Sequence, residues 1–388
     1  MITLLTKIFL KDNENLKDPK TRTMYGTICG IVGICLNIFL FAFKYFAGII
    51  SGSIAITADA FNNLSDAGSS IVTLIGFKMA DKKPDLEHPF GHGRIEYISG
   101  FIVSIAILLM GVELFKSSFA KIANPENIES SILVIAILIV SIIVKVYMYI
   151  YNKKISKKID SAAMKATALD SLSDSVATIV VLISIAIYRF TGLNIDGFSG
   201  ILVSIFILFS GYNAAKETIS PLLGNVPDKK FIDEIIKIVM SHKEITGVHD
   251  LIVHDYGPGR VIISLHAEVP GNSNVFEIHD CIDRVESELN EKLKCQSVIH
   301  MDPIALDDKK VMFMRKEVAK LVKSFNNKLS IHDFRMVEGP THTNLIFDVV
   351  VPLDLNMDYD YIENEIIKLI RDKWENYYAV IKVEKSYI

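Results

Sequence analysis

The stretch 59-DAFNNLSD-66 lies inside an apolar run, residues 54–80, that is long enough to cross a lipid bilayer. It nevertheless carries two aspartates and two asparagines. An aspartate at the centre of a membrane helix costs about 2.5–3.5 kcal/mol on insertion scales, so such residues usually face a partner, a cavity or an ion. The stretch therefore predicts a membrane protein with a functional polar site inside the bilayer.

The composition agrees with a membrane protein that has a soluble part. Half of the 388 residues are hydrophobic, and the mean hydropathy is +0.35. The 45 acidic residues outnumber the 41 Lys and Arg, which argues against a nucleic-acid partner. The four cysteines form no CxxC pair, so neither a disulfide framework nor a thiolate zinc site is predicted.

Six apolar runs have the length of a membrane span. They lie at 24–49, 54–80, 98–120, 131–151, 162–188 and 197–219. An even number of spans places both termini on the same side of the membrane. The connections 81–97 and 152–160, which contain Lys and Arg, lie on that side too. The positive-inside rule predicts that this side is the cytoplasm, for a multi-pass protein of the plasma membrane.

The apolar runs stop after 221-PLLGNVPD-228, where a charged, amphipathic pattern begins. Residues 229–242 predict a helix, 247–257 and 260–270 two strands, 274–293 a helix, and 296–303 a short strand. This order is typical of a small α+β domain of the ferredoxin-like kind.

The end of the chain repeats this pattern. The segment 247-GVHDLIVHDYGPGRVIISLHAEVP-270 is echoed by SIHDFRMVEGPTHTNLIFDVVVP at 330–352, with HD, GP and the final VP at similar intervals. We therefore divide the chain into four segments: a cytoplasmic N-terminal segment (1–23), a six-helix transmembrane domain (24–220), a ferredoxin-like domain (221–305) and a second, degenerate copy of it (306–388).

Two predicted membrane helices carry polar side chains four residues apart. Asn62 and Asp66 lie on the second span, and Asp170 and Asp174 on the fifth. Residues i and i+4 share one face of a helix, so two facing helices would bring four oxygen-bearing side chains together. That arrangement predicts a divalent-cation site. We interpret Asn63 as a helix-structural residue, and Lys145 in the fourth span as a side chain that extends to the membrane interface.

These motifs resemble those of the cation diffusion facilitator family. The resemblance rests on 51-SGSIAITADAFNNLSDAGSS-70, 85-DLEHPFGHGRIE-96, 169-LDSLSDSVAT-178, PLLGNVPD, and the GVHD, LHAEVP and IHMDP segments. It implies a homodimeric exporter in the lipid bilayer that moves divalent metal out of the cytoplasm in exchange for protons. It implies no enzyme activity and no nucleic-acid partner.

The resemblance also implies three metal sites. The transport site would be Asn62, Asp66, Asp170 and Asp174, and its lack of histidine resembles the manganese-exporting branch. Hard oxygen donors suit Mn²⁺, although Zn²⁺ binds more tightly at most sites. The second site is implied at Asp85, His88 and His92, and the third, in the cytosolic domain, at His249, His266, His279, His300 and Asp302.

The function expected from the sequence is Mn²⁺ efflux by proton antiport, with efflux of Zn²⁺, Fe²⁺ or Co²⁺ as the alternative. No cofactor is required, although Zn²⁺ or Mn²⁺ is expected to have a structural or regulatory place in the cytosolic domain, bridging two protomers. The rivals from other classes are an Mg²⁺-dependent membrane enzyme of the prenyl-transfer kind and a metal-sensing scaffold without transport. The enzyme would need Arg or Lys beside its acids to bind diphosphate, and the basic residues lie mostly in loops.

Overall fold

The computed structural model describes residues 19–51, 54–123, 131–193, 195–304, 308–352 and 354–385. Most of the predicted N-terminal segment 1–23 lies outside these residues. The chain forms two compact units, one of residues 1–225 with 255–260, and one of residues 226–254 with 261–388.

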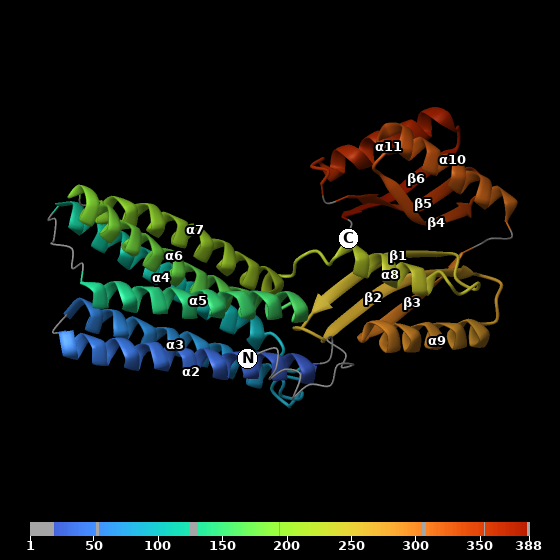
Figure 1. Ribbon diagram of the computed structural model, residues 1–388. Helices are drawn as coiled ribbons and strands as arrows, with labels where there is room; N and C mark the ends of the chain where they lie inside the picture. The colour runs from blue at the N-terminus through green and yellow to red at the C-terminus, as the bar shows by residue number, and fades with distance from the viewer. Residues whose placement is uncertain are drawn as a thin grey trace. The chain divides into compact units, whose positions relative to one another are not determined.

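The first unit is a bundle of long helices (Figure 1). In its described residues these are α2 (Pro19–Ser51), α3 (Ile54–Ala80), α4 (Ile95–Ala123), α5 (Ile132–Ile159), α6 (Ala162–Thr191) and α7 (Asp196–Leu223). Each covers one predicted apolar run to within one residue, so the predicted helical membrane domain is confirmed. Among the described residues, five of the six are long and apolar enough to span a membrane, and α3, which carries DAFNNLSD, falls outside that set.

Small residues set the packing of α3 within the bundle. Glycines at 26, 30 and 33 recur along one face of α2, and α3 packs against that face. A side chain in place of Gly33 would come within 2.9 Å of the Ser70 hydroxyl, and one in place of Gly26 would overlap the Phe77 ring. On the other side of α3, the hydroxyls of Thr73 and Thr167 lie 2.9 Å apart and join α3 to α6. α3 therefore contacts α2 on one side and α6 on the other.

The second unit contains two α+β domains with the same order of elements, which we call the first copy (residues 229–304) and the second copy (309–385). The first copy consists of α8 (Lys229–Val239), β1 (Gly247–Asp255), β2 (Val261–Pro270), α9 (Val275–Leu293) and β3 (Cys295–Ile304). The second copy consists of α10 (Lys309–Phe325), β4 (Ser330–Glu338), β5 (Thr343–Val351), α11 (Tyr359–Lys373) and β6 (Tyr377–Lys385). Each copy has a three-stranded sheet, in the orders β1-β2-β3 and β4-β5-β6, as the α+β prediction requires.

Each copy has its own hydrophobic core between sheet and helices. Alternate residues of the central strands, such as Ile263 and Leu265 on β2 and Leu345 and Phe347 on β5, are buried against the helices. Acid or amide side chains start the four helices, since Asp228, Asn274, Asp308 and Asp358 each accept a hydrogen bond from a backbone N–H of the first turn. The face of each sheet that does not pack against the helices carries polar side chains.

Candidate metal sites

The membrane unit brings together the three predicted carboxylates. Asp66 lies on α3, and Asp170 and Asp174 lie one turn apart on α6. Asp170 is buried, and the side chains of Asp66 and Asp174 are each 14 % exposed. The position of this group agrees with the prediction, and its use as a metal site stays a prediction.

A lysine lies between two of these carboxylates. The Lys145 ammonium of α5 donates to Asp66 Oδ2 and to Asp174 Oδ2, both at 2.7 Å. The side chain is 3 % exposed, so the expectation that it extends to the membrane interface is wrong. The physical reason is that two carboxylates in an apolar surrounding offer an ammonium far better solvation than its own apolar helix face does. Sequence reasoning missed this partner because periodicity does not show which residue of α5 faces α3 and α6.

The two neighbouring asparagines of α3 have different surroundings. Asn62, the predicted ligand, is exposed. Asn63 is buried, donates its amide to Asp66 Oδ2 at 3.2 Å, and keeps a buried Oδ1 without a partner. The i to i+3 spacing, like i to i+4, places Asn63 beside Asp66, and its interpretation as a helix-structural residue stays a prediction. Asn62 as a ligand stays a prediction.

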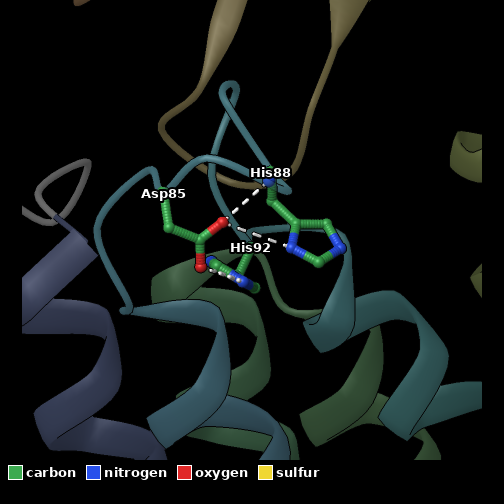
Figure 2. Close-up of side chains that lie close together, drawn as sticks. All are labelled: Asp85, His88 and His92. Carbon is green, nitrogen blue, oxygen red and sulfur yellow. Dashed lines mark hydrogen bonds and ion pairs between the residues drawn. The ribbon is translucent and has the colours of Figure 1, made fainter.

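The loop between α3 and α4 gathers the predicted second site (Figure 2). Asp85 Oδ1 is 3.4 Å from His88 Nδ1, and Asp85 Oδ2 is 3.4 Å from His92 Nε2. The Asp85 carboxylate also accepts from the backbone N–H of His88 at 2.7 Å, and this bond, with the nearby imidazoles, lowers the Asp85 pKa. One carboxylate and two imidazoles with ligand atoms within 4.8 Å of one another suit a divalent cation.

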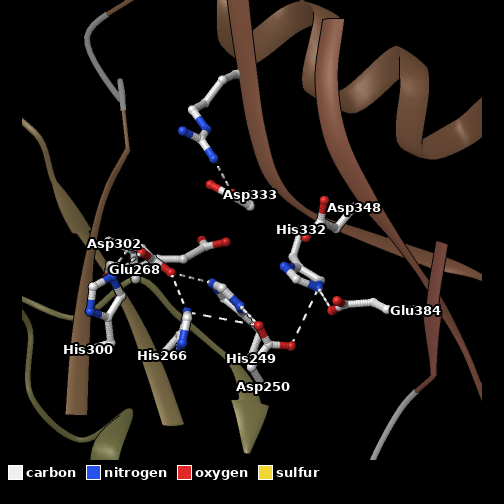
Figure 3. A network of polar contacts seen from close by, with 12 residues as sticks. His249, Asp250, His266, Glu268, His300, Asp302, His332, Asp333, Asp348 and Glu384 are labelled. Carbon is white, nitrogen blue, oxygen red and sulfur yellow. Dashed lines mark hydrogen bonds and ion pairs between the residues drawn. The ribbon is translucent and has the colours of Figure 1, made fainter. Parts of the chain in front are cut away.

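The first copy of the cytosolic fold gathers four of the five residues predicted for the third site (Figure 3). Asp302 Oδ2 on β3 is 2.9 Å from His266 Nδ1 on β2 and 3.1 Å from His249 Nε2 on β1. His300 Nε2 lies 3.3 Å from Asp302 Oδ1, and His266 and His300 are direct neighbours in the parallel β2–β3 register. Burial and the nearby His332 hold the His249 pKa below 6.5, so its ring is neutral near pH 7 and available to a metal.

His279, the fifth predicted residue, lies apart from the sheet residues. It is on α9, its side chain is 63 % exposed, and its Nδ1 is 3.4 Å from Asp283. Within one chain the structure does not add it to the cluster of Figure 3.

Sequence reasoning missed two residues near this cluster. Asp250 has a left-handed backbone, with φ of 51°, and its carboxylate reaches His249 Nδ1 at 3.5 Å. Glu384 on β6 lies 2.8 Å from His332. The sequence carries a signal for Glu384, because 380-VIKVE-384 repeats 298-VIHMD-302.

Comparison with known proteins places the chain in a family. Residues 30–223 match the cation efflux transmembrane domain, and residues 227–304 match the cytoplasmic domain of cation efflux proteins. The chain belongs to the cation diffusion facilitator family of divalent-cation efflux transporters, and it is a multi-pass membrane transporter rather than an enzyme. The cytoplasmic domain is the dimerisation domain of the family, which supports a homodimer.

Three relatives illustrate the similarity. An uncharacterized transporter of Methanocaldococcus jannaschii is 33 % identical over 273 residues, 70 % of this chain and 96 % of the relative. The cadmium, cobalt and zinc/H(+)-K(+) antiporter of Bacillus subtilis is 25 % identical, over 66 % of this chain and 82 % of the relative. The cation-efflux pump FieF of Yersinia enterocolitica is 28 % identical, over 69 % and 89 %. The second copy lies beyond both matched domains.

Proposed function

We propose that this transporter exports Mn²⁺ from the cytoplasm in exchange for protons, with Asp66, Asp170 and Asp174 as the transport site. The observation that carries the proposal is the convergence of carboxylates from α3 and α6 inside the helical bundle, with Asn63 beside them. All of these donors are hard oxygens, which Mn²⁺ prefers. Asn62, one residue away, remains the proposed fourth ligand.

Lys145 gives the metal-free site an internal counter-ion. Its ammonium occupies the same oxygens of Asp66 and Asp174 that a metal would use. A divalent cation that enters from the cytoplasm must therefore displace the ammonium, and any protons on the carboxylates, before it binds. Rearrangement of the helices then exposes the site to the outside, where protons and the returning ammonium favour release.

The alternative cargo is Zn²⁺, Fe²⁺ or Co²⁺ by the same route. Relatives of this chain are named as a cadmium, cobalt and zinc antiporter and as a cation-efflux pump. Zn²⁺ also binds more tightly than Mn²⁺ at most sites. Oxygen donors therefore favour Mn²⁺ as the transported ion but do not exclude Zn²⁺. The proton as counter-ion and the cytoplasmic position of both termini belong to the proposal.

The two other predicted sites are proposed as regulatory. The group of Asp85, His88 and His92 would bind metal in the loop after α3. His249 fits a resident metal in the cytosolic domain, because its buried ring nitrogens have no hydrogen-bond partner. His279 is exposed on α9, from where it could reach a second protomer and complete that site.

The test is metal uptake into proteoliposomes under an imposed proton gradient, with Mn²⁺ and Zn²⁺ compared. The Asp174→Asn variant should lose transport while the matched Glu217→Gln variant, which changes an exposed acid of α7, transports normally. Transport of metal by Asp174→Asn at the native rate would contradict the site. Native preference for Zn²⁺ would overturn the manganese assignment alone.

A further inference from the structure

The second copy carries ligand-type residues at the positions of the first copy's site. Three positions correspond: His249 with His332, His266 with Asp348, and Asp302 with Glu384. The first correspondence follows from the matching segments GVHD (247–250) and SIHD (330–333). The strand registers establish the other two, because Asp348 pairs with Lys382 on β6 as His266 pairs with His300 on β3, and an acid follows two residues later in both strands. The second copy therefore retains an imidazole and two carboxylates at these three positions, although it is degenerate in sequence.

The two sets of residues meet where the copies pack together (Figure 3). The rings of His249 and His332 stack with their centroids 4.3 Å apart. His332 Nε2 lies 2.8 Å from Glu384 Oε1 of its own copy and 3.6 Å from Asp250 Oδ1 of the first copy. Asp250 Oδ2 is in turn 3.5 Å from His249 Nδ1, so one carboxylate reaches an imidazole of each copy.

The imidazole nitrogens at this junction are buried and incompletely bonded. His332 is 6 % exposed, and its Nδ1 has no hydrogen-bond partner. Neither ring nitrogen of His249 forms a hydrogen bond, although carboxylate oxygens lie 3.1 and 3.5 Å away. Buried polar atoms normally have partners, and unpaired imidazole nitrogens among carboxylates are the arrangement that a divalent cation would satisfy.

A simple ion pair is the competing explanation. Lys382 Nζ lies 2.7 Å from Glu384 Oε2 and 3.8 Å from Asp348 Oδ2. Its side chain is 69 % exposed, however, and it is one ammonium beside the carboxylates of Asp250, Asp348 and Glu384. An exposed lysine is displaced at little cost, because surface ion pairs contribute little.

We propose that His332, Asp348 and Glu384, with Asp250 of the first copy, bind a second divalent cation beside the ion predicted at His249, His266 and Asp302. The ligand atoms of His332, Asp348 and Glu384 lie within 4.8 Å of one another, as do those of His249, Asp250 and His332. A mixed set of imidazole and carboxylate donors suits Zn²⁺. Because His332 belongs to both groups and Asp250 is a residue of the first copy, the ion would tie the second copy to the first.

The test counts bound Zn²⁺ in the purified full-length protein, by equilibrium dialysis against zinc chloride and elemental analysis. The variants are His332→Ala and Glu384→Gln, with His342→Ala as the matched control, since His342 is an exposed histidine of the same copy. Lys382→Met removes the competing ammonium. The transport carboxylates are unchanged throughout, so the count does not depend on the cargo or on transport.

We expect His332→Ala and Glu384→Gln to bind one Zn²⁺ fewer per chain than the native protein, and His342→Ala to match it. Lys382→Met should bind the second ion up to about fivefold more tightly, the equivalent of an exposed ion pair. An unchanged zinc count in His332→Ala would overturn the proposal, and so would loss of every cytosolic ion in that variant, since a single shared ion would then explain the cluster. If His332→Ala does not fold, His332→Cys tests the same site with Co²⁺. A thiolate-to-cobalt absorption band in His332→Cys, absent from His342→Cys, would support the site, and its absence from His332→Cys would overturn it.

Discussion

Replacement of Lys145 by methionine tests the role of the internal counter-ion most directly. The ammonium donates at 2.7 Å to both Asp66 and Asp174, and it is 3 % exposed. Methionine keeps the length and apolar bulk of the side chain and removes only the charge. We expect the variant to bind Mn²⁺ or Zn²⁺ more tightly, because the metal no longer has to displace a cation.

The magnitude follows from the contacts. Two unit charges 4 Å apart interact by about 4 kcal/mol at an effective dielectric constant of about 20, so a bound divalent cation and a fixed ammonium would repel by about 8 kcal/mol. The ammonium must therefore give up at least one carboxylate when metal binds. A hydrogen bond between charged groups contributes about 1.5–3 kcal/mol, and at about 1.4 kcal/mol per tenfold the affinity should rise about 10- to 100-fold.

The metal-free variant should also be less stable. Removal of one partner from a buried ion pair typically costs about 3–5 kcal/mol, because the remaining charges are left uncompensated. Slow release from the tighter site should lower the turnover of transport at saturating metal.

Isothermal titration of metal into the protein in nanodiscs measures the affinity, and Lys165→Met is the matched control. Lys165 is an exposed lysine of α6 that pairs with Glu217. Unchanged or weaker metal binding in Lys145→Met, with Lys165→Met like the native protein, would refute the counter-ion role. Lys145 would then serve to hold the two helices in place.

Three further outcomes are expected. Asn62→His should move the preference in uptake assays from Mn²⁺ toward Zn²⁺, by about tenfold or more, since imidazole favours zinc; an unchanged ratio would remove Asn62 from the site. Arg315→Met should lower the free energy of unfolding in urea by about 3–5 kcal/mol, because the buried Glu268 would lose its charged partner. Arg315 donates to the two Glu268 carboxylate oxygens at 2.9 and 3.1 Å. The double variant with Glu268→Gln should recover part of the loss. Burial lowers the pKa of His249 from 6.5, so the unfolded state takes up its proton first as pH falls, and the metal-free protein should lose stability below about pH 6.5. His249→Gln should lack that part of the pH dependence.

The sequence was most informative where a physical requirement leaves a one-dimensional pattern. A membrane helix needs an apolar run of a certain length, so each predicted span lies inside one of the helices α2–α7, apart from Ser131 at the start of 131–151. A strand buried on one face alternates with a period of two, so β2 and β5 were predictable from LHAEV and FDVVV. Charged side chains are expensive in hydrocarbon, so the aspartates of α3 and α6 pointed to function before any fold was known.

Contacts between elements far apart in the sequence required the tertiary structure. No periodicity shows that Lys145 of α5 lies between carboxylates of α3 and α6, because only helix packing decides which side chains face one another. The junction of His249 with His332 likewise depends on how two sheets pack, over a separation of 83 residues (332 minus 249). Length, hydrophobic period and the cost of buried charge thus belong to the sequence alone, whereas the pairing of buried charges depends on which surfaces the folded chain brings together.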